Sequence, residues 1–178
     1  MADCMATEIS IGGTIPRDLG EKLCKIIRET EAALEYGDAV FSPDTLEDLK
    51  TAIVNDSLVL CDAERAWGQF EELEAFLQKH EIPYDRHTEG RYEYDSEYVR
   101  YRPGIGVCTM PTLRSGNPVV EVASLQPVVK SIERLHKYAE GKIEKASLLR
   151  RMERLQNLLR SKLPREMPPL EGFVITVD

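Results

Sequence analysis

Two short groups of residues have the types and spacing that could build a ligand site. Gly12, Gly13 and Thr14 stand between a predicted strand and the helix after it, where backbone N–H groups can approach an anion. Asp62 follows a second predicted strand, at a place where α/β proteins often bind ligands, and Trp67 is close by. The sequence therefore predicts one candidate crevice. The glycine spacing fits neither phosphate-loop motif, so a turn, a helix cap at Asp62 and a core anchor at Trp67 are the favoured structural alternative.

A segment rich in tyrosine and in ionisable residues occupies residues 82–102. Its alternation and the turn-forming Gly90 predict a β-hairpin. Asp85 and His87 could pair for general acid/base chemistry, but alternation alone places such residues on the solvent face, which favours a structural role. Five tyrosines are candidates for cross-strand pairs and, where exposed, for a protein contact surface: Tyr84, Tyr92, Tyr94, Tyr98 and Tyr101.

Metal-binding and catalytic motifs are missing from the sequence. The cysteines Cys4, Cys24, Cys61 and Cys108 are widely spaced, form no Cys-x-x-Cys pair and are interpreted as free thiols. The three histidines are equally far apart, and neither His-Glu-x-x-His nor the Gly-x-Ser-x-Gly nucleophile elbow occurs. The sequence thus predicts no metal and no cofactor. It favours a protein without catalytic activity, although it leaves catalysis open.

The basic residues gather toward the C-terminal end. Residues 124–166 contain 11 Lys and Arg against 5 Glu, whereas the whole chain has a net charge of −8. A helix is expected from Leu148 to Leu163, with basic side chains at Arg150, Arg151, Arg154 and Arg160. We expect its stripe to be buried on the acidic domain or on a second copy: Leu148, Leu149, Met152, Leu155, Leu159 and Leu163. Nucleic-acid binding is the less favoured role, because the chain is acidic and carries no RNA-recognition signature.

The periodicity of apolar residues predicts alternating strands and helices. Strands are expected at residues 8–15, 39–41, 57–61, 82–86, 92–94, 98–102, 107–109 and 172–178. Helices are expected near residues 19–34, 42–53, 64–80, 124–139 and 148–163, with Ser42 as a cap and Gly141 causing a bend or an αα-hairpin. The last strand should return to a sheet edge. This order indicates an α/β or α+β fold, a mixed sheet with helices packed on it in a ferredoxin-like or related two-layer sandwich, and a C-terminal basic helix or helical hairpin.

Composition sets the class of protein. The chain of 178 residues is 42% apolar and 30% charged, like an ordinary globular protein, and it has no apolar run of membrane-spanning length. We expect an acidic α/β domain at residues 1–123 and, at residues 124–178, a helical extension with a C-terminal strand on the same core. The start of the chain does not look like a secretory signal, so a cytoplasmic location is expected.

These observations favour a binding or regulatory protein that acts through protein–protein contacts. It would inhibit, tether or sequester a partner, for example in a bacterium or phage, and self-association as a homodimer is a second form of such contact. One alternative is a small-molecule-binding or hydrolytic domain with its site near Gly12–Thr14 and Asp62. The other is nucleic-acid binding through the basic helix. Membrane binding is not expected.

Overall fold

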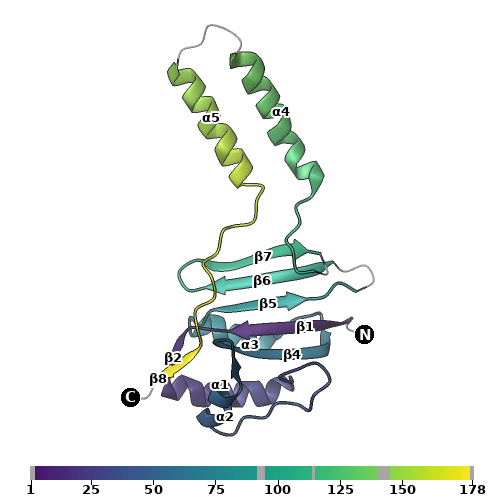
Figure 1. Ribbon diagram of the computed structural model, residues 1–178, viewed down its shortest axis with the longest axis vertical. Coiled ribbons are helices and arrows are strands. Elements are labelled where there is room, and N and C mark those ends of the chain that lie inside the picture. The colour runs from purple at the N-terminus through teal and green to yellow at the C-terminus, as the bar shows by residue number, and fades with distance from the viewer. Residues whose placement is uncertain (1–2, 92–94, 114, 140–144, 177–178) are drawn as a thin grey trace. The chain divides into compact units, whose positions relative to one another are not determined.

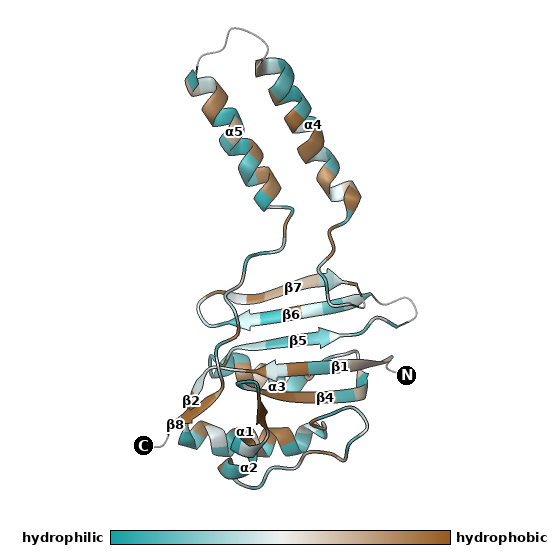
Figure 2. Ribbon diagram, viewed as in Figure 1, coloured by the Kyte–Doolittle hydropathy of each residue, from teal (hydrophilic) through white to brown (hydrophobic). Residues whose placement is uncertain are grey.

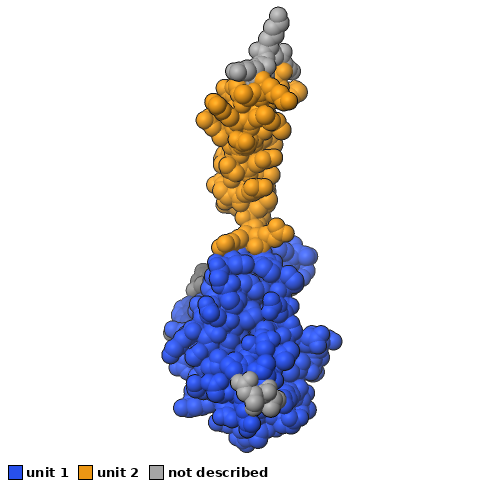
Figure 3. Space-filling view, turned by 90° about the vertical axis from the view of Figure 1, so that its left-hand side faces the viewer, with its two compact units in different colours: residues 1–118, 167–178 blue, residues 119–166 orange. Residues whose placement is uncertain are grey.

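The structure is a computed structural model that describes residues 3–91, 95–113, 115–139 and 145–176 (Figure 1). The chain divides into two compact units (Figure 3). Unit 1 comprises Met1–Pro118 and Met167–Asp178, and unit 2 comprises Val119–Glu166. The sequence pattern placed the boundary at residue 123 and joined the last strand to the helical extension. In the structure that strand belongs to unit 1.

Unit 1 contains a six-stranded antiparallel sheet in the order β3-β4-β1-β5-β6-β7 (Figure 1). The strands are β1 (Cys4–Ile11), β3 (Ile53–Val54), β4 (Ser57–Ala66), β5 (Tyr84–Thr88), β6 (Ser96–Arg102) and β7 (Gly106–Thr112). Unit 1 also contains three helices: α1 (Arg17–Thr30), α2 (Leu46–Thr51) and α3 (Glu71–Lys79). The predicted two-layer sandwich of helices on a sheet is therefore confirmed.

The core of unit 1 lies between the sheet and its helices. Ile9 and Ile11 on β1 stand opposite Leu60 and Leu58 on β4, and all four side chains are fully buried. The apolar stripe of α1, which the sequence predicted, adds Leu23, Cys24 and Ile27, and α3 adds Leu73 and Leu77. The alternating apolar side chains of the strands and the helically spaced apolar side chains of α1 and α3 thus pack together in one apolar layer.

β4 extends further than its apolar run suggests. The sequence ended this strand at Cys61 and began a helix near Glu64, but β4 continues to Ala66 and α3 begins only at Glu71. The reason is the ladder with β1, which pairs Cys4 with Ala66. Backbone pairing outweighs the helical spacing of Trp67 in this segment.

Two other element boundaries also differ from expectation. The helix expected from Ser42 begins at Leu46, because Thr45 forms the cap: its Oγ1 accepts from the N–H of Asp48 at 3.3 Å, and its own N–H donates to Asp48 Oδ2 at 2.7 Å. The C-terminal strand β8 (Val174–Thr176) does not join the large sheet. It pairs in parallel with β2 (Thr14–Pro16).

Unit 2 consists of helices α4 (Val122–Ala139) and α5 (Lys145–Arg160). The two helices are antiparallel, because the Tyr138 hydroxyl lies 3.0 Å from Ser147 Oγ while residues further back on α4 contact later residues of α5. The αα-hairpin is therefore the correct one of the two predicted alternatives, and Gly141 lies outside the described residues. Among the described residues, none of the helices is long and apolar enough to span a membrane.

Candidate functional site

The five predicted crevice residues do not form one site. Gly13 and Thr14 line a cleft of about 380 Å³ with Arg102 and Pro168. Asp62 and Trp67 line a different cleft of about 480 Å³ on another part of unit 1. The expected single crevice is therefore divided into two clefts, which share no lining residue.

Gly12 and Gly13 lie where two segments of the chain cross closely, and their backbone N–H groups already donate hydrogen bonds. Gly12 N–H donates to the Pro83 carbonyl at 3.0 Å, and Gly13 N–H donates to the Glu171 carbonyl at 3.1 Å. A Cβ on Gly12 would lie 2.2 Å from the Glu171 carbonyl oxygen, closer than any real contact. Glycine is required because β1 and the C-terminal segment pass very close together. Neither N–H is available for an anion.

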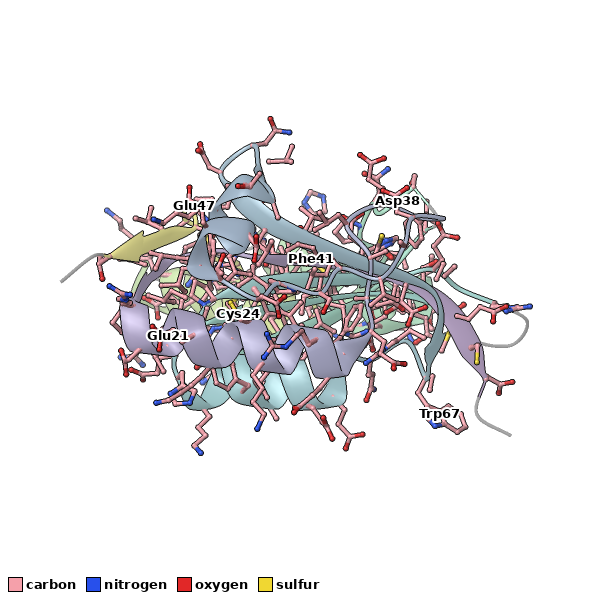
Figure 4. The ribbon with its side chains drawn as sticks, turned by 90° about the horizontal axis from the view of Figure 1, so that it is seen from below. Glu21, Cys24, Asp38, Phe41, Glu47 and Trp67 are labelled. Atoms are coloured by element: carbon pink, nitrogen blue, oxygen red, sulfur yellow. The ribbon has the colours of Figure 1, made fainter. Side chains whose placement is uncertain are left out.

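The cleft at Asp62 and Trp67 is acidic. Asp62 accepts from the Glu64 N–H at 2.9 Å and pairs with Arg65 at 3.3 Å, so its carboxylate stabilises the local chain. Trp67 is 51% exposed and has a φ of 54° in the turn after β4, and its indole points away from the body (Figure 4). The expectation that Trp67 anchors the core is therefore wrong. Other acidic side chains line this cleft: Glu29, Glu64, Glu71 and Glu72.

The tyrosines of the predicted contact surface are mostly internal. Tyr84 and Tyr101 stack with ring centroids 5.7 Å apart inside the core. Tyr98 is partly buried, donates to Asp85 at 3.0 Å, and burial raises its pKa to about 12. Tyr92 and Tyr94 lie outside the described residues. The predicted surface fails at Tyr84 and Tyr101, because the strand period turns both side chains toward the helices.

Asp85 and His87 do not form a catalytic pair. The Asp85 carboxylate accepts from Arg102 Nη1 at 2.7 Å, from Arg100 Nε at 3.4 Å and from the Tyr98 hydroxyl. His87 instead faces the Tyr98 ring edge-on, with centroids 6.3 Å apart. This cluster links β5 to β6 and fixes Arg102, whose Nε also donates to the Pro168 carbonyl at 3.0 Å.

A third cleft of unit 1 has a volume of about 630 Å³ and is lined by Cys24 of α1, which is labelled in Figure 4. The Cys24 thiol donates to the Thr45 carbonyl at 3.5 Å, and burial raises its pKa, so it is not an activated nucleophile. The cations that line this cleft are paired with neighbouring acids: Arg17 with Glu21, Arg28 with Asp44, and Lys50 with Glu47. The cleft therefore offers neither a reactive group nor an uncompensated charge.

The hairpin of unit 2 has an inner and an outer apolar face. One set of apolar side chains is partly or fully buried: Leu125, Val128 and Leu135 on α4, and Leu148, Leu155 and Leu158 on α5. Of these, Leu135, Leu155 and Leu158 line one groove between the two helices. A second set is between 40% and 77% exposed: Val122, Val129 and Ile132 on α4, and Leu149, Met152 and Leu159 on α5. Hydrophobic bands recur along both helices (Figure 2). The expected burial of the whole α5 stripe is not seen within the single chain, where no described residue of α5 is buried.

Three basic side chains of the hairpin gather in one groove. Arg134, Arg151 and Arg154 line a groove of about 300 Å³, and the guanidinium of Arg151 lies 3.7 Å above the Tyr138 ring. Sequence reasoning named Arg151 and Arg154, together with the exposed Arg150 and Arg160, but missed Arg134. It also missed the separate outer face. The spacing of three and seven residues within Val122–Ile132 and Leu149–Leu159 was the available signal.

Comparison with known proteins gives no match: no family model fits the chain, and searches of curated proteins and of solved structures find no similar protein. Function is therefore inferred from the side chains themselves.

Proposed function

We propose that this chain is a non-enzymatic binding protein whose contact element is the helical hairpin of unit 2. The observation that carries this proposal is the outer apolar face defined above, with six large side chains between 40% and 77% exposed. Large exposed apolar side chains that recur along two neighbouring helices are typical of interaction sites, because it costs free energy to leave them in water.

The energetics of a two-helix hairpin support the same conclusion. Val128 is the only described residue of unit 2 that is buried. Helices of 18 and 16 residues gain most of their stability from packing rather than from intrinsic propensity. Covering the outer face with another polypeptide would supply that packing.

The ionisable groups of unit 1 support a binding role over catalysis. Asp85 is held by Arg100 and Arg102, Arg86 by Glu74 and Glu97, and Asp62 by Arg65. Each of these groups stabilises the fold, and the buried Cys24 and Cys61 thiols have raised pKa values. The four cysteines, all within the described residues, form no disulfide, which fits a reducing compartment, so we propose a cytoplasmic location.

A capture experiment with the full chain tests the proposal. The immobilised protein is exposed to a lysate of its source cells, beside the outer-face variant Ile132→Glu/Leu159→Glu and the control Arg154→Glu from the basic groove. Proteins retained by the parent should be lost from the outer-face variant and kept by the control. Circular dichroism checks that both variants remain helical.

The same experiment separates the alternatives. One outcome is that the parent and the outer-face variant retain nucleic acid, which the Arg154→Glu control loses. In that case the function lies in the arginine groove. If both variants retain the same proteins as the parent, the outer face is not the contact element and the proposal is wrong.

A further inference from the structure

We propose that the outer apolar face of the hairpin is covered by the same face of a second copy of this chain, so that two hairpins form a four-helix bundle. This inference rests on the proposed function, because it names the partner of the same surface. It goes beyond that proposal by committing to self-association, which does not follow from exposure alone.

The spacing of the exposed residues is that of a helix-packing seam. On α4, Val122, Val129 and Ile132 are separated by seven and three residues, and on α5, Leu149, Met152 and Leu159 are separated by three and seven. Residues at such intervals lie on one line along the helix and fit between the side chains of a facing helix. Because both helices carry the same pattern, a second hairpin related by two-fold symmetry presents a matching surface.

Each seam contains one polar position. His136 occupies the seam position between Ile132 and Ala139 on α4, and Gln156 lies midway between Met152 and Leu159 on α5. A single polar residue within an apolar seam disfavours misaligned pairings, in which it would face apolar side chains. One polar position in each helix therefore favours a defined register over non-specific clustering.

The charges beside the seam favour a second copy over a strongly acidic or strongly basic partner. Glu133 and Glu153 each follow a seam residue directly, at Ile132 and Met152. Arg160 follows the seam residue Leu159 in the same way and supplies the opposite sign. Both signs are thus present on one surface, so two copies can place unlike charges opposite each other. The groove that contains the three arginines is lined by none of the six outer-face residues, so this contact does not need to cover it.

The available area has the size that a dimer needs. Six side chains that are 40% to 77% exposed offer on the order of 600 Å² of apolar surface, and a stable interface buries about 800 Å² per partner including its polar rim. The polar and charged neighbours of the seam supply that rim. The contact would resemble the core of a four-helix bundle, in which each helix packs on two others.

Sedimentation velocity of the purified full chain over a range of concentrations tests the inference. We expect the mass of two chains at micromolar concentration. The variant Ile132→Glu/Met152→Glu should dissociate at least about 100-fold more readily, because each dimer would bury four unpaired carboxylates. Arg134→Glu, in the basic groove, is the matched control and should remain dimeric. A milder variant, Ile132→Ala, should weaken the dimer and keep the helices intact.

Three results would overturn the inference. A parent chain that stays monomeric at 100-fold higher concentration excludes the dimer regardless of how the variants fold. A dimer that survives Ile132→Ala and Ile132→Glu/Met152→Glu unchanged uses another surface. A dimer that is lost in Arg134→Glu uses the groove. If the parent is monomeric but its captured proteins still depend on Ile132 and Leu159, the binding function stands and only self-association is wrong.

Discussion

Arg86→Met should lower the stability of unit 1 by several kcal/mol, because Arg86 is the centre of a buried ion network. Its side chain is only 4% exposed, its Nε lies 2.9 Å from Glu74 Oε1, and its Nη2 lies 2.7 Å from Glu97 Oε1. Nη1 also donates to the Gly68 carbonyl and to Thr88 Oγ1. Methionine has a similar length and fills the space, so the change mainly removes the charge and the donors.

The magnitude follows from what remains after the substitution. The Glu74 side chain is 12% exposed and would lose its ion-pair partner, and the Gly68 carbonyl would lose its Arg86 donor. Breaking a buried ion pair by removing one partner costs about 3 to 5 kcal/mol. For a unit of this size, that corresponds to a fall in melting temperature of about 10 to 20 °C. Arg28→Ala, whose partner Asp44 is 85% exposed, should cost less than about 1 kcal/mol.

Thermal and urea unfolding, followed by circular dichroism, provide the measurement. The double variant Arg86→Met/Glu74→Gln should recover part of the loss, because the uncompensated carboxylate is gone. If Arg86→Met costs no more than Arg28→Ala, or if the double variant is no more stable than Arg86→Met alone, the network does not stabilise unit 1 as argued.

Two further predictions concern the backbone crossing and the thiols. Gly12→Ala should lower the melting temperature clearly more than Gly172→Ala, because a Cβ at residue 12 would meet the Glu171 carbonyl oxygen at 2.2 Å, whereas one at residue 172 would lie 3.4 Å from Asp56 Cβ, an ordinary contact. Equal melting temperatures would contradict the close crossing at Gly12. Burial raises the pKa of Cys24 and Cys61, so both thiols should stay protonated at pH 8 and react more slowly with a disulfide reagent than in urea, as mass mapping of the labelled cysteines can measure. Because the pKa of both thiols is raised in the folded state, they do not lower the free energy of unfolding below pH 8. That free energy falls as the pH rises past the ordinary thiol pKa, where the unfolded chain loses its thiol protons first. Fast labelling of Cys24 and Cys61 in the folded protein would refute this.

The sequence predicted most of the elements and the layer type, because periodicity reports which face of an element is buried. The strand at Ser57–Cys61 and the helix with Leu23 and Ile27 are present, and the helical hairpin is one of the two alternatives that the sequence left open. It failed where a long-range contact decides the local structure. β4 runs to Ala66 because β1 pairs with it, and this leaves Trp67 exposed in a turn.

The candidate sites were harder to predict, because the same residue types serve structure and chemistry. Gly12 and Gly13 look like an anion-binding turn, but the sequence does not show that the Glu171 and Pro83 carbonyls already accept their N–H groups. Tyr84 has the right spacing for a contact surface, but the sequence does not show that its strand face is the one covered by helices. The pairing partners that settle both cases are distant in the chain.

The two units differ in how their charged and apolar side chains are covered. In unit 1, the buried polar side chains of Arg86 and Arg102 are held by carboxylates from other elements, so these charges stabilise the fold. In unit 2, the described charges other than Lys162 are exposed, and the described apolar side chains other than Val128 are only partly covered. A surface that keeps Ile132 and Met152 half exposed is destabilising for an isolated chain, because each side chain would gain free energy on burial. The hairpin therefore has the properties expected of an element that is completed by binding.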